Sequence, residues 1–134
     1  MTLRSGYFAD WGGNPTVLLW GDAAGMRDLR DFLRRIQSVP RPSSLDAFCE
    51  AVDAKKIVVS MIADRRSTGM RLSGQGLEWT LRSESADDFA EMVDALVSSN
   101  GGHQYLDGSS DSITVTVSTG EYPASLHPDR PASR

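Results

Sequence analysis

The chain has 134 residues, the usual size of one globular domain with a single hydrophobic core. It carries 18 acidic and 14 basic residues, and the formal net charge of −4 does not favour contact with nucleic-acid phosphates or anionic lipids. Because Cys49 is the single cysteine, an intramolecular disulfide is excluded. The N-terminus lacks the apolar stretch of a secretory signal, and no apolar run is long enough to span a membrane. We therefore expect a cytoplasmic protein, with Cys49 buried, that binds neither nucleic acid nor membrane.

The first forty residues predict a β-hairpin followed by a helix. Residues 3–10 and 16–20 have strand character, and the turn between them contains glycine, asparagine and proline. Asp22 is suited to cap a helix that ends near Ser38. Apolar side chains recur at helical spacing along this segment, namely Met26, Leu29, Phe32, Leu33 and Ile36.

The middle of the chain predicts a short helix and three strands. Residues 43–46 have the serine-to-acid spacing of a capping box, which favours a short helix over residues 44–53. Residues 57–63 are apolar on both alternating faces, as expected for an interior strand that is covered on both sides. Residues 70–73 and 77–82 predict a second hairpin, whose second arm alternates apolar and polar side chains.

The last third of the chain predicts a helix, a hairpin and a tail. The helix runs from about Ser85 to Asn100, with aspartates in its first turn and two glycines after its end. The hairpin has strands at 103–106 and 113–118. We expect residues 1–123 to form one domain and residues 124–134, which are rich in proline, serine and arginine, to form a disordered tail.

This order of elements predicts an α+β fold. Because the connections have hairpin length, we expect a single antiparallel sheet of about six or seven strands with two main helices packed on one face. The two halves also match when the numbering is shifted by sixty, so that Val17 and Leu19 fall on Leu77 and Trp79. An internal ββα duplication would explain this match, although any two amphipathic helices would produce much of it.

Two surfaces are candidates for binding another protein. The last helix carries Asp87, Asp88, Glu91 and Asp94 without a basic residue, and such an acidic face suits a basic partner. A solvated helix that lies beside the arginine-bearing first helix would show the same pattern. The second candidate is the exposed side of the sheet around Trp20 and Tyr105.

His103 is the one histidine within the predicted domain and the best candidate for chemistry. In the expected register of the last hairpin it would meet Glu121 or Tyr122, and it shares a strand face with Tyr105. A histidine that is oriented by a carboxylate can act as a general base near neutral pH. A histidine that is hydrogen-bonded at a sheet edge is the more ordinary outcome, and the chain lacks a nucleophile motif. We expect no cofactor and no metal site, because the second histidine, His127, lies in the predicted tail and no pair of cysteines is available as ligands.

The C-terminal part of the chain carries a resemblance. Residues 102–106, with the sequence GHQYL, and residues 115–123, with the sequence VTVSTGEYP, resemble the ending of a group of small uncharacterised bacterial proteins. The resemblance covers about the final third of the chain and implies no activity and no functional residue. As a class, small acidic α+β proteins are similar to the immunity proteins that neutralise bacterial toxins.

The leading hypothesis is a small, non-enzymatic cytosolic protein that binds another protein, and an immunity-like role is one concrete version of it. The alternative is a small-molecule-binding or hydrolytic domain that uses His103 with Glu121 and Tyr105. A third hypothesis is a homodimer, because the strand at 57–62 needs cover on both of its faces.

Overall fold

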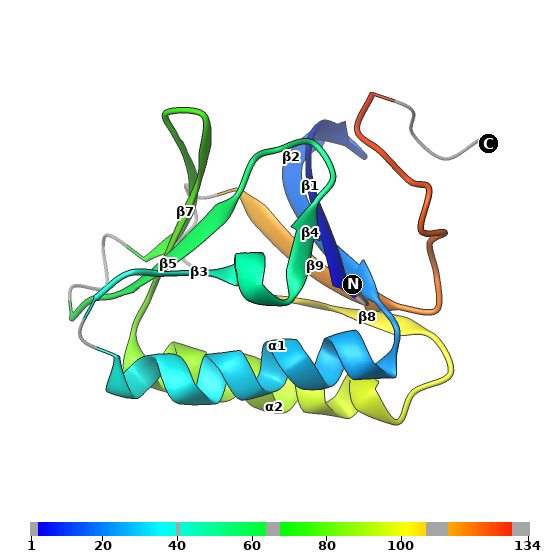
Figure 1. The fold of residues 1–134 in the computed structure, drawn as a ribbon. Coiled ribbons are helices and arrows are strands. Elements are labelled where there is room, and N and C mark those ends of the chain that lie inside the picture. Colours follow the sequence, from blue (N-terminus) through cyan, green and yellow to red (C-terminus); the bar gives the residue numbers. More distant parts are fainter. Residues whose placement is uncertain (1–2, 40, 64–67, 107–112, 130–134) are drawn as a thin grey trace.

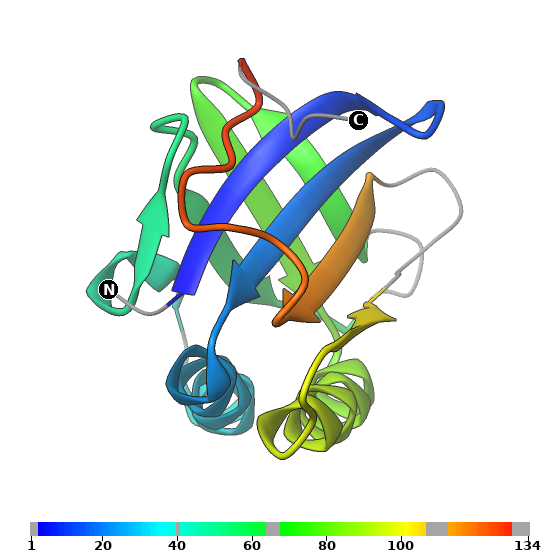
Figure 2. The same cartoon turned by 90° about the vertical axis from the view of Figure 1, so that its right-hand side faces the viewer.

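Two β-sheets stand over a layer of two helices in the computed structural model (Figure 1). The helices, α1 (Ala23–Arg35) and α2 (Ser83–Val97), lie side by side, and Figure 2 shows them end-on beneath both sheets. Among the described residues there is no helix with the length and apolar character needed to cross a lipid bilayer. The structure describes residues 3–39, 41–63, 68–106 and 113–129.

Within the described ranges the two sheets have five and four strands, and both sheets are mixed. The larger sheet has the order β4-β1-β2-β9-β8, and these strands are Cys49–Ala51, Leu3–Trp11, Asn14–Gly21, Thr114–Thr119 and Gly102–Tyr105. The smaller sheet has the order β3-β5-β7-β6, and its strands are Ser43–Ser44, Ile57–Met61, Gly76–Leu81 and Gly69–Ser73. The α+β class is confirmed, whereas the prediction of a single antiparallel sheet is wrong.

Three strand pairs are parallel, and none of them joins strands that are consecutive along the chain. Each long helix follows a hairpin, so the unit ββα occurs twice, as β1-β2-α1 and as β6-β7-α2. The strand β9 pairs in parallel with β2 of the first unit, and β5 pairs in parallel with β7 of the second. The short strand β4 pairs in parallel with β1. Parallel strands need a longer connection than a hairpin turn. Both long helices lie between β2 and β9, and α1 lies between β1 and β4, whereas the chain between β5 and β7 includes the strand β6. Short connections in the sequence therefore revealed the antiparallel hairpins but not these pairs.

One large core lies between the sheets and the helices. Val17 and Leu19 of β2 and the matching Leu77 and Trp79 of β7 are all buried in it. The indole of Trp79 stacks on Phe89 of α2, with 6.1 Å between the ring centroids. The apolar stripe predicted for the first helix is also buried, namely Met26, Leu29, Phe32, Leu33 and Ile36.

The two long helices begin differently. Asp22 caps α1 as predicted, because its Oδ1 accepts a hydrogen bond from the backbone nitrogen of Gly25 at 2.9 Å. At the matching position before α2 stands Arg82, which makes no side-chain cap and pairs with Glu84 in the first turn. The shift by sixty therefore preserves the helix but not its cap.

Residues 44–53 do not form the predicted helix. They contain a single 3₁₀ turn, η2 (Leu45–Ala47), between the short strands β3 and β4. Ser44 Oγ does accept a hydrogen bond from the backbone nitrogen of Asp46 at 3.1 Å. The 3₁₀ turn does not extend into an α-helix, because the backbone on either side of it pairs with β5 and β1. Cys49 is buried as expected, and this burial raises the pKa of its thiol to about 11.

The strand β5 lies inside its sheet, as predicted, but has cover on one face only. Ile57 and Val59 point into the core, whereas Val58 is 38% exposed. The surface around Val58 is polar, because Arg71 and Glu78 on the neighbouring strands form an ion pair at 3.3 Å. The sequence predicted that both faces of β5 are covered, but within the described residues no segment covers the face that carries Val58.

Residues 120–129, here called the C-terminal strap, cross the outer face of the larger sheet (orange to red in Figure 2). Leu126 is 3% exposed and belongs to a second, smaller apolar cluster with Phe8, Leu18 and Trp20. The indole Nε1 of Trp20 donates a hydrogen bond to the backbone oxygen of Pro123 at 3.0 Å. The predicted disordered tail begins at residue 124; the structure places residues 124–129 against the sheet, and residues 130–134 lie outside the described residues.

Candidate functional site

Part of the outer face of the larger sheet stays accessible beside the strap. The strap passes close over β1, where a Cβ atom on Gly6 would stand 3.2 Å from Pro128. Farther across the sheet, β8 is the edge strand, and its outward side chains, His103 and Tyr105, stand opposite residues of β9. Tyr105 is 55% exposed. The accessible area therefore lies between the strap and the β8 edge.

A hollow of about 200 Å³, here called the aromatic trough, opens in this area. Threonines from β2 and β9 lie on the sheet itself and form its floor, namely Thr16, Thr114 and Thr116. Four residues with rings and one amide complete the lining, namely Trp11, Tyr122, His103, Tyr105 and Asn14. These residues come from the first hairpin, the last hairpin and the strap.

The rings around the trough support one another. Trp11 meets Phe8 at 4.8 Å and Tyr122 at 5.5 Å between ring centroids, both in edge-to-face geometry. His103 and Tyr105 form another edge-to-face pair at 5.3 Å. Because Trp11 ends β1 and Tyr122 belongs to the strap, the position of each ring depends on the other segment.

The carboxylate of Glu121 adjoins the trough through His103. Its Oε1 accepts a hydrogen bond from Ser118 Oγ at 2.6 Å and lies 3.1 Å from Nδ1 of His103, which is the contact expected from the hairpin register. Burial acts to raise the pKa of Glu121, but the hydrogen bonds from Ser118 and His103 outweigh it, so this pKa is below its ordinary value. Glu121 is therefore anionic at neutral pH.

Gly120 makes the turn that brings Glu121 to this place. Its φ of +73° is in the left-handed region that favours glycine. A Cβ atom there would stand only 2.8 Å from the backbone oxygen of Asn100, in the turn that leads into β8. The backbone can therefore turn directly after β9, and the Glu121 carboxylate returns to Ser118 on that strand.

The geometry suits recognition better than nucleophilic catalysis. With Nδ1 of His103 against Glu121, only Nε2 is left to meet another molecule. Ser118 is fully buried and its hydroxyl donates to Glu121, so it is not placed as a nucleophile. The trough is smaller than the roughly 300–1,000 Å³ of typical small-molecule pockets. In the part of the chain that the structure describes, no three metal-ligating side chains gather.

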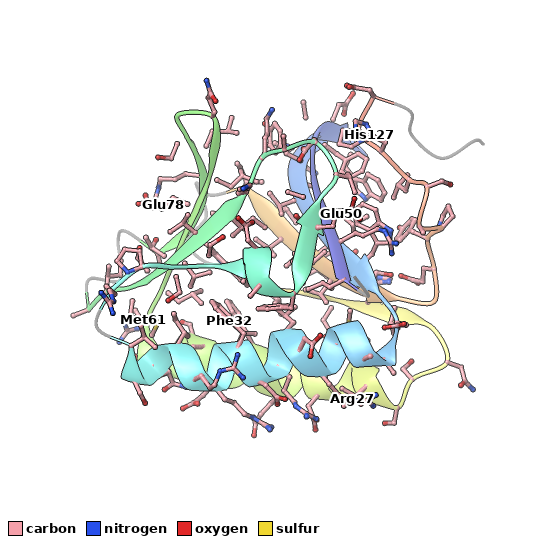
Figure 3. All side chains as sticks on the ribbon, viewed as in Figure 1. Arg27, Phe32, Glu50, Met61, Glu78 and His127 are labelled. Carbon is pink, nitrogen blue, oxygen red and sulfur yellow. The ribbon has the colours of Figure 1, made fainter. Side chains whose placement is uncertain are left out.

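The acidic face of the last helix is partly occupied by α1 and by the 3₁₀ turn that follows it, η1 (Ile36–Ser38). Asp94 pairs with Arg30 at 2.7 Å, and Asp87 accepts a hydrogen bond from Gln37 at 2.6 Å. This is the arrangement of a charged helix lying beside the arginine-bearing helix. The other side chains of α1 divide between core and solvent, and Figure 3 shows Phe32 between helix and sheets and Arg27 on the far side. In the described ranges, two of the predicted carboxylates make no hydrogen bond or ion pair, namely Asp88 and Glu91.

Trp20 was predicted to lie on an exposed binding surface. The structure corrects this prediction, because Trp20 is buried. It does lie on the outer face, where it stands opposite Arg4 and Ser118, but it is only 2% exposed. Strand alternation indicates the face on which a side chain lies and not whether a distant segment covers that face. The strap covers Trp20 and leaves Tyr105 open.

Sequence reasoning missed Trp11, which it placed in a turn, and gave no role to Tyr122 beyond a contact with His103. Threonine alternates with valine along β9, and this pattern places Thr114 and Thr116 on one face of the strand. No local pattern could bring Trp11 and Tyr122 together, because they lie at opposite ends of the chain. Comparisons of the chain with models of protein families, with curated proteins and with solved structures found no match.

Proposed function

We propose that this chain is a non-enzymatic binding protein that acts in the cytoplasm and docks a protein partner on the aromatic trough. The observation that carries the proposal is the gathering of four ring side chains from three separate segments around an accessible hollow. Tyrosine and tryptophan are enriched at the energetic centres of protein interfaces. Tyr105 is the anchor of this surface, because it is the most exposed large apolar side chain on the described surface.

The acidic helix face is a weaker candidate for the same role. Asp94 and Asp87 already contact Arg30 and Gln37, so a partner would have to compete with these contacts. Isolated surface carboxylates such as Asp88 and Glu91 change association rates more than affinity. We therefore assign the partner to the sheet face.

Site-specific photo-crosslinking in cells tests the docking surface. The photoreactive residue p-benzoylphenylalanine replaces Tyr105, and in separate variants it replaces Glu91 on α2 or Leu72 on β6. We expect one discrete adduct from position 105 and none from the other two, and mass spectrometry identifies the protein in it. Binding of that purified protein should weaken at least tenfold in Tyr105→Ser and remain within twofold in Leu72→Ser. An adduct from position 91 alone, or equal binding by both serine variants, would refute this surface.

The immunity-like version makes a narrower prediction. If the partner is a toxin of the same cell, its expression should arrest growth, and co-expression of the present chain should restore growth. Tyr105→Ser should fail to restore it at equal protein level, whereas Leu72→Ser should succeed. If expression of the partner leaves growth unchanged, the immunity role is rejected and the binding role is unaffected.

A small-molecule-binding or hydrolytic domain is the second candidate, and the 3.1 Å contact between His103 Nδ1 and Glu121 favours it. On this hypothesis His103 activates water through Nε2, with Tyr105 lining the site. Activated esters and phosphoesters should then be hydrolysed by the unmodified protein and not by His103→Gln. Equal rates for the two proteins would dismiss the catalytic role.

Self-association through the outer face of the smaller sheet is a subordinate proposal. It has the support of one partly exposed apolar side chain, Val58, on the inner strand β5. Light scattering at high concentration should then report a dimer that Val58→Lys converts to a monomer. A monomer in both proteins would contradict it.

A further inference from the structure

We propose that the aromatic trough receives an arginine side chain of the partner, with Glu121 as the nearby counter-charge. This inference rests on the proposed function, because it specifies the chemistry that the docked partner presents. It follows from three properties of the trough, namely its size, its lining and its charge.

The size of the trough suits one long side chain. Its volume of about 200 Å³ is below that of ordinary small-molecule pockets, and it is open to solvent along the accessible face of the sheet. A free small ligand loses its own translational freedom when it binds. A side chain that projects from a partner surface loses none separately, because the partner as a whole has already bound.

The lining suits a planar cation. Guanidinium groups stack on tryptophan and tyrosine rings, and Trp11, Tyr105 and Tyr122 supply such rings here. A guanidinium has five N–H donors and no acceptor, and the floor offers the hydroxyl oxygens of Thr114 and Thr116 as acceptors. An ammonium group lacks the planar shape that stacks in this way, so we expect arginine in preference to lysine.

The charge of the region favours the same occupant. Glu121 is anionic, and its oxygens face His103 and Ser118 at the border of the trough. The phenol of Tyr122 stays neutral at physiological pH, because burial, followed by the charges of Glu121 and Tyr105, raises its pKa. The whole chain carries a net charge of −4, which favours the approach of a cationic surface.

Peptide titrations followed by NMR test the inference on the full chain. The probes are two pentapeptides, glycine-serine-X-serine-glycine with blocked ends, in which X is arginine or its neutral analogue citrulline. We expect the arginine peptide to shift the indole signal of Trp11 and to bind at least tenfold more tightly than the citrulline peptide. The buried indole of Trp79, in the core between the sheets and the helices, serves as the internal reference and should not move.

Two variants separate the role of Glu121 from a general effect of charge. Glu121→Gln should weaken the arginine peptide at least fivefold, whereas Glu91→Gln, which removes the same charge from the distant α2, should change it less than twofold. An unshifted Trp79 indole signal in both variants shows that the fold is intact. Equal binding of the two peptides, an unmoved Trp11 signal, or equal effects of the two variants would overturn the inference.

The inference and the proposed function fail in distinguishable ways. If a partner is crosslinked at position 105 but the arginine peptide is not preferred, the docking surface is supported and the arginine occupant is rejected. If the arginine peptide is preferred but no protein is crosslinked, a cation-binding site is supported and the docking of a protein partner is rejected.

Discussion

Substitution of Leu126 by alanine tests whether the C-terminal strap is part of the folded domain. Leu126 is 3% exposed and packs against Phe8, Leu18 and Trp20 on the outer face of the larger sheet. The change removes most of an apolar side chain from this cluster and leaves the strap backbone intact. If residues 124–129 were a disordered tail, the same change would have almost no effect on stability.

The expected loss follows from burial. Replacing a buried leucine by alanine costs about 2–5 kcal/mol, and the cost is lowest where the surroundings can relax into the space. The strap is a single segment over a small cluster, so we expect about 2–3 kcal/mol for Leu126→Ala. At about 4 °C per kcal/mol for a domain of this size, the melting temperature should fall by about 8–12 °C.

Urea denaturation followed by tryptophan fluorescence measures this loss. Leu72→Ala is the matched control, because Leu72 is 50% exposed on β6 and the same substitution there should cost about 1 kcal/mol or less. If the strap lifts before the domain unfolds, Trp20 emission should shift to longer wavelength ahead of the circular-dichroism transition, since its indole loses Pro123. Equal losses for the two leucine variants would refute the packing role of the strap.

Three further predictions concern single carboxylates. Asp22→Ala should destabilise the protein by about 1 kcal/mol in urea, because it removes the cap of α1, and a loss below about 0.3 kcal/mol would contradict that role. Asp94→Lys should lower the melting temperature more than Glu91→Lys, since only the former places a cation against Arg30, and equal shifts would count against the pair. Glu121 has a pKa below that of the unfolded chain, so its contribution to stability is present above the unfolded value of about 4.3 and is lost as pH falls through the folded pKa. Glu121→Gln should therefore flatten the fall in stability between about pH 5 and pH 3, and an unchanged slope would contradict this assignment.

The elements with local signals were predictable from sequence. The stripe from Met26 to Ile36 indicated α1, and glycines at the tight turns marked the hairpins. Residues 44–53 were predicted as a helix because the capping-box spacing is a local signal, whereas the pairing of β3 and β4 with distant strands is not. The three parallel pairs escaped prediction for the same reason, and in one of them Thr16 meets Thr114 across almost the whole chain.

The candidate site was predictable where it depends on one hairpin. The contact of His103 with Glu121 follows from the register of β8 and β9, which the alternation of β9 already indicated. The trough itself was not predictable, because Trp11 reaches it from the first hairpin and Tyr122 from the strap. Proline and serine in the strap hid its role, because its burial rests on single contacts such as Leu126 and not on a periodic pattern.

The exchange of strands between the two ββα units makes the halves of the chain interdependent. A cut between Met61 and Gly69 would give two fragments, and each would hold two strands of the sheet that the other fragment begins. We expect neither fragment to fold when alone and the mixture to regain the native spectrum, as in complementation of split proteins. During evolution, a change in β9 would likewise have to suit β2 at the far end of the gene, so the two halves can only diverge together.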